Sequence, residues 1–424
     1  MRRLLHIARL PTTKEVVINT FGNYLNVFFT AFYALLLVRI MTPSQYGVLS
    51  VLFAITYLLA NVLDFGVTAS IYSYLPPILH DRQETYKFIK ANFVFQTILS
   101  TIAIVLLFIF IQPVDNAILK LHVPMSSFFW TFVSIPMFIW QNSLLNIFFA
   151  ARKFLIANIA LNIANVIKTS ILLYFIWQKN ATINAIIITL GIIGPLLFIV
   201  ILVYNRYPDV TRILKTSFDR SSIRLKYTLT FFLSSQLFNL SSRVDLFMLS
   251  FYLPKAEVGY YGLSQKIILT ILTSVNSITQ VLSPQFAKAN TRTEVQSHIK
   301  KAILYMSVPT LLFIIAAILP TWVYTLIFTM QYEKTALITR LLSASYLLYG
   351  ISAVPSLFFL YTIRKPIHLC VNNFVFLMII SFGCFWLIPR FGVLGPTIAF
   401  FACFIWSTIY LFGYYFIEVK KMKE

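Results

Sequence analysis

Four ionisable side chains lie well inside long apolar segments of the sequence: Asp64, Lys168, Arg243 and Asp245. Each would cost roughly 2.5 to 3.5 kcal/mol if it faced lipid at the centre of a bilayer. These residues must therefore face water, a partner or a bound ligand. Cations in such a position suit an anionic ligand, and an arginine holds phosphate oxygens in a fixed fork. Arg243 and Lys168 are therefore candidate contacts to a negatively charged substrate.

The two carboxylates allow more than one interpretation. Arg243 and Asp245 are two positions apart, so on a helix they point to different faces and are poorly placed to neutralise each other. Asp64 or Asp245 is a candidate site for a coupling proton or sodium ion. Alternatively, either carboxylate pairs with a cation on a neighbouring helix and only fastens the helices together.

Polar residues recur every three or four positions along segments 16–40, 46–72, 154–177, 227–251 and 258–286, which places them on one face of each predicted helix. A single stripe of this kind usually holds helices together. Matched stripes in both halves of the chain favour a hydrated cavity instead. The candidate substrate-binding residues are therefore Arg243, Lys168, Asn23, Asn26, Asn239, Lys266 and Gln280.

The elements that must position these residues are membrane-spanning helices. Hydrophobic residues make up 59% of the 424 positions and charged residues only 11%, far from the roughly 25% charged residues of a soluble domain. Repeated apolar stretches are long enough to cross about 30 Å of hydrocarbon as helices. The sequence predicts an all-α membrane protein with twelve spans, at residues 16–40, 46–72, 88–112, 124–150, 154–177, 183–205, 227–251, 258–286, 300–328, 335–362, 366–388 and 393–417.

Charge in the connections predicts the orientation of these spans. Counted over alternate loops and the adjoining span ends, one side of the membrane carries twenty-four Lys and Arg residues and the other carries eight. Because cytoplasmic loops are enriched in Lys and Arg, both termini are predicted to be cytoplasmic. The net charge of +21 is then explained by membrane topology, and nucleic acid is not expected as a partner.

An internal repeat divides the chain into halves. Pro43 and Gly47 correspond to Pro254 and Gly259 at offsets of 211 and 212. We therefore predict an N-terminal lobe at 1–205, a basic cytoplasmic linker at 206–226 and a C-terminal lobe at 227–424. Six spans in each half give the two lobes the same orientation, related by an axis along the membrane normal, with a central cavity between them.

The sequence lacks the residues that several classes of function require. The sequence has no Gly-x4-Gly-Lys-Ser/Thr phosphate loop, so direct ATP hydrolysis is not expected. Its five histidines are dispersed without metal-ligand or triad spacing, and its three cysteines fall in the last two spans. We expect no catalytic residues, no bound metal and no cofactor beyond a coupling H⁺ or Na⁺.

Short motifs resemble the polysaccharide transporter family, the O-antigen and capsule flippases of the multidrug/oligosaccharidyl-lipid/polysaccharide superfamily. The first is the stretch from Val38 to Gly47, followed by Asp64-Phe65-Gly66. The second runs from Arg243 through Asp245 to Pro254 and is followed by Gly259 and Tyr261. The resemblance extends over most of the chain in layout.

This resemblance implies two six-helix lobes around a cavity lined by spans 1, 2, 7 and 8. It also implies a polyprenyl-pyrophosphate-linked oligosaccharide as substrate, turned across the cytoplasmic membrane for surface polysaccharide assembly. Membrane lipids and other polysaccharide assembly proteins are the implied partners. Among the candidate site residues, the resemblance implies a binding role for Arg243 and Asp245 at most.

Two alternatives stay open at this point. An ion-coupled multidrug exporter of the same superfamily has the same layout, with a cavity rich in acids and aromatic residues for organic cations. A membrane-embedded polysaccharide-processing enzyme would need an acid/base pair or an intramembrane histidine, which the sequence does not show. The favoured hypothesis is a flippase that works by alternating access.

Overall fold

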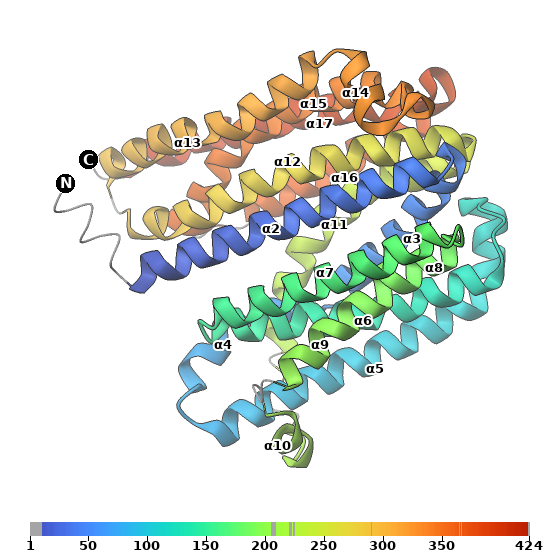
Figure 1. Ribbon diagram of the computed structural model, residues 1–424. Helices are drawn as coiled ribbons and strands as arrows, with labels where there is room; N and C mark the ends of the chain where they lie inside the picture. The colour runs from blue at the N-terminus through green and yellow to red at the C-terminus, as the bar shows by residue number, and fades with distance from the viewer. Residues whose placement is uncertain are drawn as a thin grey trace. The chain divides into compact units, whose positions relative to one another are not determined.

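The computed structural model describes residues 11–204, 209–219, 223, 225–289, 291–363, 365 and 367–422. All regular structure in this part of the chain is helical (Figure 1). The chain forms two compact units, and each is considered by itself.

The first unit contains the chain up to Tyr33, Leu52–Ala117 and His122–Leu233. The helices that lie wholly or partly in it are α2 (Pro11–Ile40), α3 (Pro43–Val62), α4 (Val67–Ile78), α5 (Arg82–Val114), η1 (Asp115–Leu119), α6 (Met125–Ala150), α7 (Phe154–Trp177), α8 (Ile183–Ile187), η2 (Ile188–Ile193), α9 (Gly194–Tyr204) and α10 (Val210–Lys215).

The second unit contains Ala34–Val51, Ile118–Leu121 and Ser234–Glu424. Its remaining helices are α11 (Leu225–Tyr252), α12 (Lys255–Lys288), α13 (Arg292–Ile318), α14 (Thr321–Phe328), η4 (Met330–Tyr332), α15 (Lys334–Leu357), η5 (Phe358–Thr362), α16 (Ile367–Phe391), η6 (Gly392–Leu394) and α17 (Gly395–Lys420). The predicted lobes at 1–205 and 227–424 stay a prediction.

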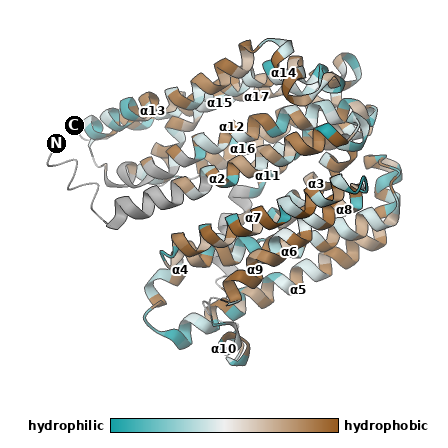
Figure 2. Cartoon of the chain, in the orientation of Figure 1, coloured by the Kyte–Doolittle hydropathy of each residue, from teal (hydrophilic) through white to brown (hydrophobic). Residues whose placement is uncertain are grey.

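Each predicted span consists mainly of helical structure. Eight helical segments of the described residues are long and apolar enough to cross a membrane, and the last of these, Ile367–Lys420, contains two of the predicted spans. Figure 2 shows hydrophobic residues along most of the helical length and hydrophilic residues gathered at helix ends and connections. The predicted fold class, an all-helical polytopic membrane protein, is confirmed.

The predicted span at 46–72 is interrupted between α3 and α4. Phe65 and Gly66 have positive φ angles of 47° and 77°, a left-handed conformation that suits glycine and is uncommon for phenylalanine. The Phe65 ring stacks on Phe232, with centroids 4.8 Å apart. Asp64 precedes this break and accepts a hydrogen bond from the backbone N–H of Thr68 at 3.2 Å. The interruption therefore places a carboxylate where the first turn of α4 leaves N–H groups without helical partners.

The predicted span at 300–328 was wrong at its C-terminal end. Helix α13 stops at Ile318, and α14 begins at Thr321. Pro320 disfavours helical backbone at the preceding residue, and Leu319 adopts φ −59° and ψ 127°. Arg340 donates from Nε to the Leu319 carbonyl at 2.9 Å and from Nη2 to Thr321 Oγ1 at 2.9 Å. A charged side chain thus satisfies the backbone at the break.

Two repeat-equivalent glycines pack against each other inside the second unit. A Cβ on Gly47 would overlap the backbone carbonyl of Lys255, and a Cβ on Gly259 would overlap the backbone carbonyl of Pro43. Only a residue without a side chain allows the first turns of α3 and α12 to approach so closely. The Tyr332 hydroxyl donates to the Met41 carbonyl at 3.0 Å beside this crossing.

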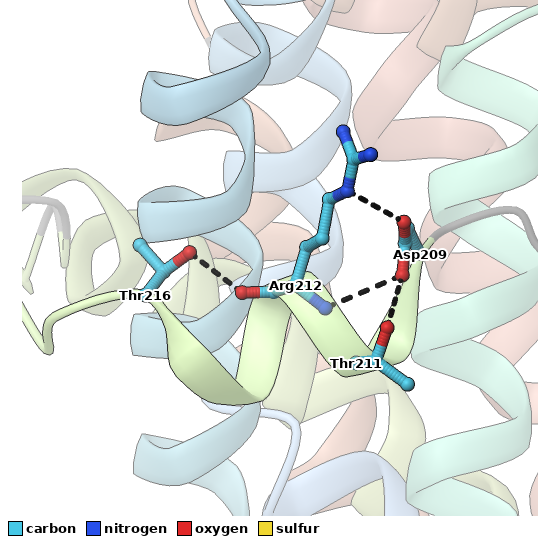
Figure 3. Close-up of polar contacts among 4 residues, drawn as sticks. All are labelled: Asp209, Thr211, Arg212 and Thr216. Carbon is cyan, nitrogen blue, oxygen red and sulfur yellow. Dashed lines mark hydrogen bonds and ion pairs between the residues drawn. The ribbon is translucent and has the colours of Figure 1, made fainter.

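Within the predicted linker 206–226, the structure contains the short helix α10, which packs on α5. Asp209 caps α10 by accepting hydrogen bonds from Arg212 N at 3.2 Å and Thr211 Oγ1 at 2.7 Å (Figure 3). Lys90 of α5 donates to the carbonyls of Leu214 and Thr216 at 2.8 and 2.6 Å. The Ile213 side chain joins an apolar cluster formed by α4, α5 and α6. The helix is therefore fixed at both ends and along its apolar face.

Candidate functional site

Asp245 of α11 is the centre of a buried hydrogen-bond group in the second unit. Its side chain is completely buried. One carboxylate oxygen accepts from the Tyr261 hydroxyl at 2.5 Å and from Gln265 Nε2 at 2.8 Å, and the other accepts from the backbone N–H of Leu246 at 2.8 Å. Both donor side chains come from α12. Asp245 therefore ties α11 to α12.

One cation, Arg243, lies near this carboxylate, and a second, Lys266, lies near Arg243. Arg243 of α11 interacts electrostatically with Asp245 and with Lys266 of α12. The side chains of Arg243 and Lys266 are both partly exposed. Like charges on adjacent buried helices are unfavourable without compensation. Asp245 lies beside Arg243, and its carboxylate is also held by Tyr261 and Gln265.

Asn239 lies one helical turn before Arg243 on α11 and is partly exposed. Its side-chain amide donates weakly to Gln236 Oε1, at 3.4 Å. Three of the predicted residues, Asn239, Arg243 and Lys266, are thus carried by two helices of one unit. The side chain of Gln280, further along α12, lies outside the described residues.

Lys168 of α7 occupies a different environment, in the first unit. Its Nζ lies 4.9 Å from the centroid of the Tyr33 ring, within the range of a cation–π contact. A Cβ on Gly194 would come within 2.9 Å of Lys168 Cδ. The lysine side chain therefore runs past the start of α9, where the absence of a side chain at Gly194 leaves room for it.

Asn26 of α2 belongs to the same polar group as Lys168. Asn26 Oδ1 accepts from Asn165 Nδ2 at 3.0 Å. The Tyr33 hydroxyl donates to the Asn165 carbonyl at 2.9 Å and accepts from Thr169 Oγ1 at 3.2 Å. These hydrogen bonds join the polar faces of α2 and α7 to each other, which is the role expected of polar side chains between membrane helices. The side chain of Asn23 lies outside the described residues.

Asp64, which is partly exposed, forms a second carboxylate group entirely within the first unit. Its oxygens accept from Thr68 Oγ1 at 3.0 Å and from Gln96 Nε2 at 3.0 Å. Gln96 in turn accepts from Ser143 Oγ at 2.6 Å, and Asn146 donates to Thr68 Oγ1 at 3.0 Å. The side chains that donate to Asp64 here are therefore a hydroxyl and an amide, both uncharged.

The predicted site residues thus separate into distinct groups. Arg243, Asp245 and Lys266 come together in one unit, while Asp64 and Lys168 belong to different groups of the other. Sequence reasoning missed Tyr261, Gln265 and Gln96, although Gln265 and Gln96 are amides inside apolar segments, which is a usable signal. Among the described residues no group of three or more His, Cys, Asp or Glu side chains is placed to hold a metal ion.

Comparisons with known proteins found a matching family and matching folds. Residues 12–290 match the family described as "Polysaccharide biosynthesis protein". None of the curated protein sequences matches the chain significantly. The family match covers well over half of the chain, and its bounds include Arg243, Asp245 and Lys266.

Solved transporter structures share the fold at low sequence identity. An inward-facing multidrug resistance MATE family transporter of the MOP superfamily is 15% identical with a TM-score of 0.72, over 93% of this chain and 95% of its own. The Lipid II flippase MurJ, in an inward closed conformation, is 14% identical with a TM-score of 0.72, over 96% and 90%. The MATE multidrug transporter DinF-BH is 15% identical with a TM-score of 0.69, over 98% of each chain. At these identities the likeness concerns the fold alone.

Proposed function

Because the chain belongs to the polysaccharide biosynthesis protein family, we propose that it is a flippase for lipid-linked oligosaccharides. Its substrate is a polyprenyl-pyrophosphate-linked repeat unit, and it works by alternating access in the cytoplasmic membrane, with both termini in the cytoplasm. The products serve surface polysaccharide assembly, so other assembly proteins are expected partners. The fold shared with a lipid flippase supports this proposal.

The observation that carries the proposal is the pair of cations on α11 and α12. Arg243 and Lys266 interact with each other electrostatically, and each lies in a helix that is one of the predicted spans. Holding two positive charges together in a membrane segment is unfavourable unless an anion joins them. A pyrophosphate carries several charged oxygens and suits both an arginine fork and a lysine point charge.

Energy for transport would come from an ion gradient. Of the two candidate coupling residues, Asp64 is favoured because the side chains that donate to it, Thr68 and Gln96, are uncharged. A carboxylate in such surroundings can exchange a proton or a sodium ion without breaking an ion pair with those donors. Asp245 is already engaged by three donors and by the charge of Arg243, so its main role is to hold α11 against α12.

The test is export in a deletion strain complemented with variants of the chain. Arg243→Ala combined with Lys266→Ala should leave the protein in the membrane, abolish surface polysaccharide and cause lipid-linked repeat units to accumulate on the cytoplasmic side. The matched control is Arg390→Ala, which removes an exposed arginine that lies 3.8 Å from the centroid of the Trp386 ring in the same unit. That variant should export normally.

Normal export by the Arg243→Ala, Lys266→Ala double variant would overturn the role of the cation pair. Normal surface polysaccharide in the deletion strain itself would overturn the flippase proposal. The multidrug-exporter alternative predicts instead that the deletion strain becomes sensitive to cationic drugs while its surface polysaccharide stays unchanged. Arg243 and Lys266 do not favour organic cations, which their charge would repel.

A further inference from the structure

The second unit contains a cavity of about 230 Å³. It lies among α11, α12, α15, α16 and α17, and its lining includes residues from all five helices. Since one water molecule occupies about 30 Å³ in the liquid, the cavity has room for several waters or for one small chemical group. It is smaller than the roughly 300 to 1,000 Å³ of sites for drug-sized ligands.

The lining of this cavity combines apolar side chains with uncharged polar groups. Amide and hydroxyl groups come from Asn276, Thr279, Ser352, Asn372, Asn373 and Ser407. None of the described lining residues is Asp, Glu, Lys, Arg or His. A lining of this kind offers hydrogen-bond donors and acceptors but no counter-ion, so it selects an uncharged occupant.

Aromatic rings form another part of the wall. Phe376 and Phe404 pack edge to face, with centroids 5.3 Å apart, and Tyr349 packs on Phe404 at 5.6 Å. All three residues line the cavity. Aromatic faces beside amides and hydroxyls match a molecule that has polar groups around its edge and C–H groups on its face.

Asn372 supplies a second and independent indication of a ligand. Its side chain is only 5% exposed, and its Oδ1 has no hydrogen-bond partner among the described residues. Its amide group makes a long contact of 3.4 Å to Asn373 Oδ1. A buried carbonyl oxygen without a donor costs about 1 to 3 kcal/mol, and such groups in native proteins have an explanation. A group that enters the cavity and donates a hydrogen bond would satisfy this oxygen.

We propose that this cavity binds one uncharged sugar ring. The ring donates a hydroxyl hydrogen bond to Asn372 Oδ1 and packs its C–H face against the aromatic wall. This inference rests on the proposed function, because the ring belongs to the oligosaccharide that the protein transports. Ten residues of α12 separate Asn276 at the cavity from Lys266 at the cation pair, about 15 Å along a helix. A short oligosaccharide attached to a pyrophosphate spans such a distance.

The experiment measures thermal stability of the full-length protein in lipid nanodiscs. The probes are three soluble sugars, methyl glucoside, methyl galactoside and N-acetylglucosamine, each titrated into the wild type and the variants. At least one sugar should raise Tm in a saturable way, since a ligand that binds the native state stabilises it. Asn372→Leu should weaken that binding at least tenfold. Without sugar this variant should be no less stable than the wild type, because the unpartnered amide has been removed.

Two further variants complete the design. Ala353→Leu narrows the cavity without removing a polar group and should also abolish the sugar-dependent rise in Tm. Asn162→Leu makes the same substitution in the other unit, where Asn162 Oδ1 likewise has no partner among the described residues. Because Asn162 does not line this cavity, its variant should respond to sugar as the wild type does.

The outcomes separate this inference from the proposed function. If no sugar raises the Tm of the wild type, or if Asn372→Leu responds like the wild type, the sugar site is overturned. The flippase proposal then still stands or falls by the export assay of the Arg243 and Lys266 variants. If the sugar response behaves as expected while the deletion strain exports normally, the flippase proposal falls and the cavity keeps its sugar-binding role.

Discussion

At the scale of single residues, the hydrogen bonds to Asp245 account for much of the structure around the cation pair. Tyr261→Phe removes the 2.5 Å hydrogen bond to this carboxylate and leaves the rest of the side chain in place. Because Asp245 is completely buried, the loss should destabilise the protein by about 1 to 3 kcal/mol. The expected result is a lower Tm in nanodiscs, measured by intrinsic fluorescence.

Tyr260→Phe is the matched control for this variant. Tyr260 precedes Tyr261 on α12, and none of the described residues accepts a hydrogen bond from its hydroxyl. The free energy of unfolding of this variant should lie within about 0.5 kcal/mol of the wild-type value, as is usual for substitutions that remove no buried contact or hydrogen bond. Equal stability of the two variants would show that the bond to Asp245 contributes nothing.

The sequence indicates the charged residues of the candidate site and misses their partners. Arg243, Asp245 and Lys266 stand out because charge inside an apolar segment is rare in any membrane protein. Tyr261 and Gln265 do not stand out, because their role depends on the rotation of α12 about its axis. That rotation is fixed by close packing at Gly259, which no periodicity predicts. The cavity at Asn372 is equally invisible, since it is formed by five helices at once.

At the scale of elements, the break between α13 and α14 depends on a side chain from α15. Arg340→Leu removes the donors to the Leu319 carbonyl and to Thr321 Oγ1. A hydrogen bond to a charged group contributes about 1.5 to 3 kcal/mol. We expect a loss of that order in the free energy of unfolding, measured by chemical denaturation in mixed micelles.

Lys334→Leu gives the corresponding control on the same helix. Lys334 pairs with Glu257 at 2.6 Å, but its side chain is 65% exposed. Exposed ion pairs contribute about 0 to 1 kcal/mol to stability. The free energy of unfolding of this variant should therefore be close to the wild-type value. A larger loss for Lys334→Leu than for Arg340→Leu would contradict the assigned role of Arg340.

The stability that the Asp209 cap gives to α10 should depend on pH. The hydrogen bond from Thr211, followed by that from Arg212 N, holds the pKa of Asp209 below its ordinary value. A carboxylate with a depressed pKa stabilises the fold above its unfolded pKa of about 3.9, and loses this effect as the pH falls through the folded pKa. Hydrogen exchange of the α10 amides, corrected for intrinsic rates, should therefore accelerate only at acidic pH.

Thr211 of α10 and Thr216, the residue that follows α10, test this dependence directly (Figure 3). Thr211→Val removes a hydrogen bond to Asp209, so the loss of protection should move to higher pH. Thr216→Val removes a hydroxyl that instead donates to the Arg212 carbonyl at 2.8 Å, and should leave the pH of the transition unchanged. Identical transitions in both variants would exclude Thr211 as a determinant of the Asp209 pKa.

Hydrophobic length and periodicity predict most elements of this fold. The span at 154–177 matches α7, Phe154–Trp177, because a long apolar run has clear polar limits. The span at 300–328 was wrong since Pro320 breaks the helix inside an apolar run that continues beyond it. Helix α10 was missed because six residues show no period, and its stability comes from contacts with α5 that are distant in sequence.

At the scale of the whole molecule, the proposed orientation can be tested with cysteine labelling. In a chain whose Cys370, Cys384 and Cys403 are replaced by serine, Lys179→Cys should react with a membrane-impermeant maleimide in intact cells. Lys215→Cys, in α10, should react only after the inner membrane is permeabilised. Both lysines are exposed, so accessibility within the protein does not distinguish them. The reverse pattern would place the termini outside the cytoplasm.

The length of α5 has a consequence for the bilayer around the protein. The helix has 33 residues, so it is about 50 Å long and exceeds the hydrocarbon thickness of a membrane. Its uncharged part, from Ala91 to Val114, measures roughly 36 Å and remains slightly too long for an average bilayer. The surplus requires tilt or local thickening. Lipids with longer acyl chains should thus match this helix better than short-chain lipids do.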